Sequence, residues 1–197
     1  MRASGGRLTP QWAVIALAGE SGVGKTFLAK ELAFHAGTSK RRIRVVGGEC
    51  RPVIAHDDDV VDVGGAPLHP FRTVLTAIAD DCRAHPEITT RVLGQRGAIL
   101  APYESALSTL PAVAVQPAPP EIPATLALRR ILEALTDTIA AWVDSRGPLL
   151  LMLDDLQWAD EVSLAWLRHG AAGLVTGRKV LLLLTWRSEE AEPEMLA

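Results

Sequence analysis

The residues with the clearest potential for chemistry form one continuous run near the N-terminus. They match the phosphate-loop pattern G-x-x-x-x-G-K-[ST] at every fixed position, as Gly19, Glu20, Ser21, Gly22, Val23, Gly24, Lys25 and Thr26. Glycines are needed because backbone N–H groups must turn inward around phosphate oxygens, where a Cβ would obstruct them. Lys25 supplies a charge to the β and γ phosphates, and the Thr26 hydroxyl can bind Mg²⁺. The run predicts a site for a nucleoside triphosphate with Mg²⁺.

The segments on either side of this run support the interpretation. Gln11 to Ala18 is a short apolar stretch that predicts a buried strand. Phe27 to His35 has helical spacing of apolar residues, namely Leu28 and Leu32 with Ala29 and Ala33 beside them. A phosphate loop needs a strand before it and a helix after it, because the helix presents its positive dipole end to the anion. The alternative is a glycine-rich turn without a ligand.

Two acidic residues follow a second apolar run. Leu149 to Leu153 leads directly into Asp154 and Asp155, and the carboxyl ends of strands form the edge of a parallel α/β sheet where ligands bind. We expect Asp154 to be the Mg²⁺ partner, through water, and Asp155 to orient or polarise the water that attacks the γ phosphate. The alternative is a strand that ends in a solvated turn, which the phosphate loop in the same chain makes less favourable.

The remaining pattern predicts the elements that position these groups. Further strands are expected from Arg42 to Cys50 and from Val180 to Leu184. A helix is expected from Pro70, with its apolar face formed by Phe71, Val74, Leu75, Ile78 and Cys82, and another from Leu128 to Trp142. Between the last two strands, Asp160 could cap a helix that buries Leu164, Leu167, Ala171 and Leu174. Doubly buried strands alternating with helices predict an α/β fold with a mostly parallel sheet.

Length and composition limit the classes of function. The 197 residues suit one domain, and 48% hydrophobic residues are ample for a core. A formal net charge of −3 gives no footprint for nucleic acid, so no such contact is expected. Cys50 and Cys82 form no C-x-x-C pair, which favours a reducing cytoplasm over a zinc site or disulfides. No segment approaches the roughly 20 apolar residues that span a bilayer, so no membrane contact is expected.

Three other segments have competing interpretations. The basic cluster from Lys40 to Arg44 is expected to be a solvated loop rather than a binding patch. The acidic run from His56 to Asp59 is expected to be solvated rather than a metal site. Residues 101–123 contain six prolines among small residues and predict an irregular insertion within a single domain, residues 1–197.

The segment LLLMLDDLQWADEVSL, residues 149–164, closely resembles the Walker B region of STAND-class signal-transduction ATPases. These are the AAA+-like modules of large LuxR-type transcriptional regulators and of related regulators with cyclase or kinase domains. Three further places fit the same family. They are Val45 to Cys50, which ends in G-E-C; Pro67 to Phe71, where the family often has P-Y-x-P-F; and Leu181 to Arg187. The resemblance covers most of residues 12–187.

The resemblance implies a fold and a set of roles. It implies a P-loop NTPase three-layer sandwich of the additional-strand (ASCE) type that binds ATP or ADP with Mg²⁺. In that family the arginine after the fourth core strand senses the γ phosphate, which would assign this role to Arg187. The alternative is an ordinary surface arginine beside Glu189 and Glu190. Trp158 is expected to pack against the sheet edge before it contacts a partner, and Gln157 to reach the attacking water or the neighbouring loop.

The chain departs from the family pattern at both ends. The G-R-E segment that partly recognises adenine is missing upstream of the first strand, and only ten residues follow Arg187. We therefore expect a chain truncated at its C-terminus, without the fifth strand and the C-terminal lid, and with the phosphate-loop strand at the sheet edge. A fragment of a regulator, a protein completed by self-association or by a partner, and a degenerate remnant stay open. Without a lid, nucleotide affinity should be weak and turnover slow.

Three functions remain in competition. The first is an ATP-binding, slowly hydrolysing switch whose output is a conformational state. The second is a nucleotide-binding remnant or interaction protein without catalysis. The third is a small-molecule kinase, which is disfavoured because Arg91 and Arg96 are too isolated to form an arginine-rich lid.

Overall fold

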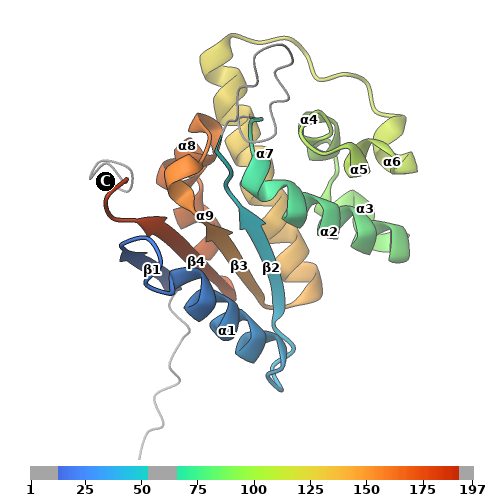
Figure 1. Ribbon diagram of the computed structural model, residues 1–197. Helices are drawn as coiled ribbons and strands as arrows, with labels where there is room; N and C mark the ends of the chain where they lie inside the picture. The colour runs from blue at the N-terminus through green and yellow to red at the C-terminus, as the bar shows by residue number, and fades with distance from the viewer. Residues whose placement is uncertain (1–12, 53–65, 191–197) are drawn as a thin grey trace, which may run out of the picture.

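The computed structural model describes residues 13–52 and 66–190, which form a four-stranded sheet with helices on both faces (Figure 1). The strands are β1 (Ala13–Gly19), β2 (Arg44–Glu49), β3 (Leu149–Asp154) and β4 (Val180–Arg187). The longer helices are α1 (Lys25–Gly37), α2 (Arg72–Ala84), α7 (Ala124–Arg146) and α8 (Glu161–His169). The shorter ones are α3 (Pro86–Val92), α4 (Arg96–Leu100), α5 (Ser105–Ser108), α6 (Pro111–Ala114), α9 (Ala171–Val175), and the single 3₁₀ turns η1 (His69–Phe71) and η2 (Leu156–Trp158). The acidic run from His56 to Asp59 lies outside the described residues.

The sheet is parallel and has the order β1-β4-β3-β2. This confirms the predicted α/β fold of a P-loop NTPase, and the phosphate-loop strand lies at one edge of the described sheet, as expected. The register aligns the strand ends, since Gly19 lies opposite Arg187 and Glu49 opposite Asp154. All the groups that follow these strands therefore meet at the carboxyl end of the sheet.

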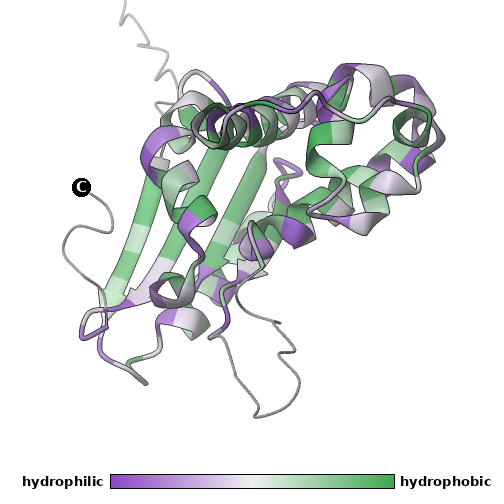
Figure 2. Ribbon diagram, turned by 90° about the horizontal axis from the view of Figure 1, so that it is seen from above, coloured by the Kyte–Doolittle hydropathy of each residue, from purple (hydrophilic) through white to green (hydrophobic). Residues whose placement is uncertain are grey.

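β3 and β4 are buried on both faces of the sheet, because their residues are mostly apolar and successive side chains of a strand point to opposite faces. Leu150 and Leu183 point to the face covered by α1, where they pack with Ala29. Leu149, Leu151 and the other members of their hydrophobic cluster on the strands point to the opposite face, which α7, α8 and α9 cover. Figure 2 shows the strands hydrophobic along most of their length. The result is the three-layer arrangement of helix, sheet and helix.

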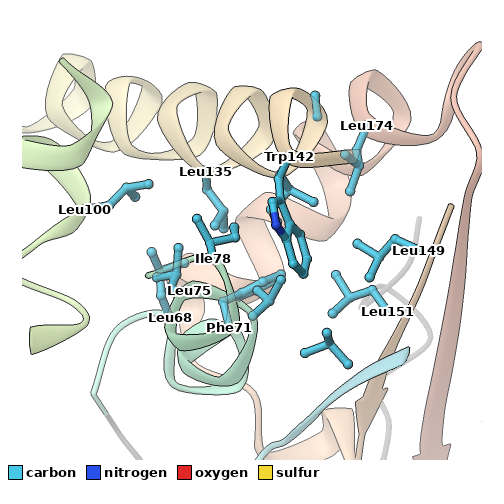
Figure 3. Packing of buried hydrophobic residues seen from close by; sticks show 14 of the residues in the cluster. Leu68, Phe71, Leu75, Ile78, Leu100, Leu135, Trp142, Leu149, Leu151 and Leu174 are labelled. Carbon is cyan, nitrogen blue, oxygen red and sulfur yellow. The ribbon is translucent and has the colours of Figure 1, made fainter. Parts of the chain in front are cut away.

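The largest part of the core lies between α2, α7 and the sheet. Figure 3 shows Trp142 of α7 between Ile78 and Phe71 on one side and the strand residues Leu149 and Leu151 on the other. All five are at most 2% exposed. Full burial of side chains of this size stabilises a fold by about 1.5–3 kcal/mol each. The predicted apolar face of α2 is correct, since its members from Phe71 to Cys82 are all buried.

Two glycines, one in β2 and one after α8, allow close packing. A Cβ on Gly48 of β2 would lie 1.8 Å from the carbonyl oxygen of Pro70, so only glycine lets the η1 turn approach the strand. This contact joins residues 45–50 to residues 67–71, two segments singled out in the sequence. A Cβ on Gly170 would lie 2.7 Å from the indole ring of Trp166.

Gly170 also marks a difference from the sequence prediction. The single helix expected after Asp160 is divided into α8 and α9 at this residue. The large residue that α8 buries is Trp166, which is 0% exposed, whereas Leu164 and Leu167 are only partly buried. The indole N–H of Trp166 donates to Thr136 Oγ1 of α7 at 2.9 Å. Trp166, rather than the two leucines, is therefore the large residue that α8 buries in the core.

The proline-rich segment is more regular than predicted. Within residues 101–123 the chain forms α5 and α6, and Leu107, Leu110 and Val113 are buried against the core. Pro111 opens α6, because a proline ring at the first helical position costs no hydrogen bond. The longest stretch of this segment without helix is residues 115–123. Together with α3 and α4, these helices form the lobe at the right of Figure 1.

β1 is less buried than predicted. Ile15 and Leu17 face α1, but Val14 is 43% exposed, and Ala16 and Ala18 on the same face are also exposed. The hydrophobic cluster on that face is built on β3 and β4. α1 also leaves Leu28 at 54% exposure, although the sequence pattern placed it on the buried face. β1 lies at the edge of the described sheet, and the helices that cover this face of β3 and β4 leave it exposed.

Candidate nucleotide-binding site

The phosphate loop connects β1 to α1 as the sequence pattern requires. Gly22 and Gly24 have φ angles of 79° and 93°, in the left-handed region that glycine adopts without a steric cost. Gly24 is the residue before α1, so the loop passes directly into the N-terminus of a 13-residue helix. The Lys25 ammonium group donates to the carbonyl oxygens of Gly19 and Glu20, both at 2.7 Å. The lysine therefore spans the loop from one end to the other.

Thr26 and Asp154 bring the two halves of the site into contact. The Thr26 hydroxyl donates to Asp154 Oδ1 at 3.2 Å. Asp154 is 5% exposed, and the same oxygen accepts a short hydrogen bond from the Thr185 hydroxyl of β4. Thr185 in turn accepts the backbone N–H of Asp155 at 3.0 Å. One buried threonine thus holds both the carboxylate of Asp154 and the backbone of Asp155.

Asp155 has an unusual backbone conformation. Its φ of 57° places a non-glycine residue in the left-handed region, which is uncommon and is often found at functional sites. Gln157 Nε2 donates to Asp155 Oδ1 at 2.9 Å, and Gln157 Oε1 accepts the N–H of Arg187 at 3.1 Å. The Gln157 amide therefore links the second carboxylate to the end of β4, whereas the sequence prediction allowed it either the water or the neighbouring loop.

Arg187 lies at the same edge but has other partners. Its guanidinium group stacks over the Trp158 ring at 4.5 Å and donates to Glu190 Oε1 at 2.8 Å. Trp158 is partly buried against the core, in agreement with the expectation that it packs against the sheet edge. The backbone of Arg187 pairs with Gly19 at the start of the loop. The arginine is close to the site, and its side chain is held by an aromatic ring and a carboxylate.

The edge is acidic in a way that suits a bound cation. Burial, together with the nearby carboxylates of Asp160, Asp155, Asp154 and Glu49, raises the pKa of the Cys50 thiol to about 12. Within the described residues no group of three or more His, Cys, Asp and Glu side chains could hold a metal by itself. Magnesium at a nucleotide needs only one or two protein oxygens, because phosphates and waters complete its shell. The Thr26 hydroxyl and the Asp154 carboxylate fit that requirement.

A comparison with known families identifies the family of this chain. Residues 3–183 match the family model described as AAA ATPase domain. The chain belongs to this family. Among curated proteins none matches the chain. Family membership supports a nucleotide-binding ATPase module, which agrees with a glycine-rich loop that opens a helix beside a buried carboxylate.

Two residues at this site were missed as site residues in the sequence. Thr185 is the first polar residue after the apolar run of β4, and that position at a strand end was the available signal. Glu189 accepts a hydrogen bond from the N–H of Ser21 in the phosphate loop, and no pattern in the sequence indicates this contact.

In the described parts of the chain, none of the helices combines the length and the apolar content that a membrane crossing requires.

Proposed function

We propose that this ATPase domain is a nucleotide-operated switch of a STAND-type signalling or transcription regulator, which binds ATP with Mg²⁺ and hydrolyses it slowly. One observation carries the proposal. A continuous chain of hydrogen bonds runs from Thr26 through Asp154, Thr185 and Asp155 to Gln157, and ends at the N–H of Arg187. Such a chain can couple the occupant of the loop to the end of β4.

Binding is assigned to the loop and its helix. The N–H groups from Gly19 to Thr26 and the dipole of α1 attract phosphate oxygens, and Lys25 adds a positive charge. Thr26 and Asp154 supply oxygens for Mg²⁺, Asp154 through water. Bound Mg²⁺ would neutralise charge on the phosphates.

Hydrolysis is assigned to Asp155. Its carboxylate orients the attacking water and accepts a proton from it. Gln157 is a positioning residue, because its amide fixes the carboxylate oxygen that it touches. Slow turnover is expected because Trp158 and Glu190 hold the Arg187 guanidinium group. Lys25 is then the cation that already contacts the loop.

The switch is expected to act through the residues that follow β4. As a sensor of the γ phosphate, Arg187 would leave Glu190 and Trp158 and bind the phosphate. The backbone of Arg187, whose N–H donates to Gln157, would then change. Hydrogen–deuterium exchange of residues 185–190 should therefore differ between Mg·ATP and Mg·ADP. The difference should disappear in Lys25→Ala, which removes the loop cation. Identical exchange with ATP, ADP and no nucleotide would contradict the switch.

A second function remains in competition, a nucleotide-binding interaction module without hydrolysis. The pairing of Arg187 with Glu190 favours it, because an arginine held in this way contributes nothing to the transition state. The two functions differ in whether bound ATP is converted to ADP. Transfer of phosphate to an added acceptor would instead indicate a kinase.

A further inference from the structure

A glutamate shortly after β4 lies on the phosphate loop. β4 ends at Arg187, and the next two residues turn over the start of the loop. The N–H of Ser188 donates to the carbonyl oxygen of Gly19 at 3.2 Å, and Glu189 Oε1 accepts the N–H of Ser21 at 2.8 Å. These bonds extend the pairing of β1 with β4, which ends where Gly19 lies opposite Arg187. Glu189 is thereby held against the first half of the loop.

This contact places a negative charge on a loop that attracts negative ligands. The pKa of the Glu189 carboxyl lies below its usual value, mainly because its own N–H and that of Ser21 stabilise the charged form. The Lys25 ammonium group contributes in the same direction. The exposed side chain is therefore ionised at neutral pH. An N–H that donates to this carboxylate is not available to a phosphate oxygen at the same time.

The position of Glu189 indicates which phosphate it opposes. The Lys25 ammonium group, which is assigned to the β and γ phosphates, reaches back to the carbonyl oxygens of Gly19 and Glu20, directly before Ser21. Ser21 lies beside the turn that follows β4, and β4 ends at Arg187, the proposed sensor of the γ phosphate. The carboxylate is thus on the side of the site where ATP and ADP differ.

We propose that Glu189 is a specificity-determining residue that lowers the affinity of the site for ATP relative to ADP. The repulsion between its carboxylate and the terminal phosphate of ATP is the physical cause. The inference rests on the proposed nucleotide site and deepens it, because the site then has a resting preference for ADP. Binding of ATP requires Glu189 to leave Ser21, so the phosphate state is transmitted to the backbone that follows Arg187.

Glu189→Gln tests the charge separately from the hydrogen bond, because glutamine keeps an oxygen that can accept the Ser21 N–H. Calorimetric titration should show about 3- to 10-fold tighter binding of Mg·ATP and less than about 2-fold change for Mg·ADP, since one exposed charge pair has an effect of this size. The gain should shrink in about 0.5 M KCl, where surface charges are screened. Glu189→Asp keeps the charge and should stay close to the native protein.

Glu31→Gln is the matched control, because it removes the same charge from the exposed face of α1, where Glu31 lies 3.8 Å from His35. It should change neither affinity. Equal tightening for both nucleotides, weaker ATP binding, or no change in Glu189→Gln would overturn the inference, while binding that depends on Lys25 would leave the proposed function intact. Failure of the native protein to bind either nucleotide would overturn both.

Discussion

Thr26 and Asp154 are in hydrogen-bond contact at 3.2 Å, although 128 positions separate them along the chain. The contact joins the start of α1, where the phosphate loop ends, to the end of β3, where the acidic pair begins. Both side chains present oxygen, the ligand type that Mg²⁺ prefers. The fold therefore brings together the two groups that the sequence assigned to one metal.

A double-mutant cycle tests whether these groups share one function. Thr26→Ala and Asp154→Asn should each weaken ATP binding in the presence of Mg²⁺, and neither should matter once EDTA has removed the metal. Because the residues touch, the combined effect should differ from the sum by about 1 kcal/mol, within the range measured for contacting pairs. Titration calorimetry on the four proteins gives this value. Strict additivity would indicate two independent contributions.

Gln157→Ala should separate catalysis from binding. Loss of the amide frees the Asp155 carboxylate, and a misplaced catalytic group can reduce a rate by about 10- to 100-fold. The single-turnover rate of ATP hydrolysis should fall by that amount, with the Kd for ATP changed by less than about 2-fold. Gln95→Ala, on an exposed residue next to α4, is the control. A parallel loss of binding and rate would contradict the positioning role.

Gly48→Ala should destabilise the fold. The new Cβ would lie 1.8 Å from the Pro70 carbonyl oxygen, and this backbone atom cannot move without shifting η1. Overpacking of this kind costs about 1–3 kcal/mol or more in the free energy of unfolding. Gly47→Ala is a matched control on the same strand, because its Cβ would meet only the flexible end of Met152, at 3.0 Å. Urea unfolding curves should show the larger loss for Gly48→Ala.

Asp81 should contribute stability that disappears in acid. Burial alone would raise its pKa, but hydrogen bonds from Trp142 and Arg146 and the charges of Arg146 and Arg44 outweigh burial and lower it. The folded-state pKa therefore lies below the unfolded value of about 3.9. The stabilisation is fully present above that value and is lost as the pH falls through the folded-state pKa. Asp81→Asn should flatten the acid limb of a plot of unfolding free energy against pH, and an unchanged limb would contradict this assignment.

The fold and the loop could be predicted because their signals are local. Spacing of glycine and lysine specifies the loop, and continuous apolar runs specify the strands. The short helices α3 to α6 escaped prediction because four to seven residues are fewer than a periodic pattern needs. The exposure of Val14 depends on which distant helices cover β1.

The parts of the site that sequence reasoning missed are set by contacts between strand ends. Thr185 is one threonine among many until β4 lies beside β3 and its hydroxyl meets Asp154. Likewise, the partners of Arg187 and Glu189 depend on how the chain turns after β4. Such turns have no periodicity from which they could be read.

The most direct test of the proposed switch is a single-turnover measurement of ATP hydrolysis in the native protein and in Asp155→Asn. Asparagine keeps the shape and the oxygen that Gln157 contacts, but it cannot accept a proton from water. The native protein should convert bound ATP to ADP slowly, and Asp155→Asn should bind ATP with similar affinity and lose at least about 100-fold in rate. Asp137→Asn, on the exposed side of α7, should behave as the native protein. Equal rates in the native protein and Asp155→Asn would contradict the account.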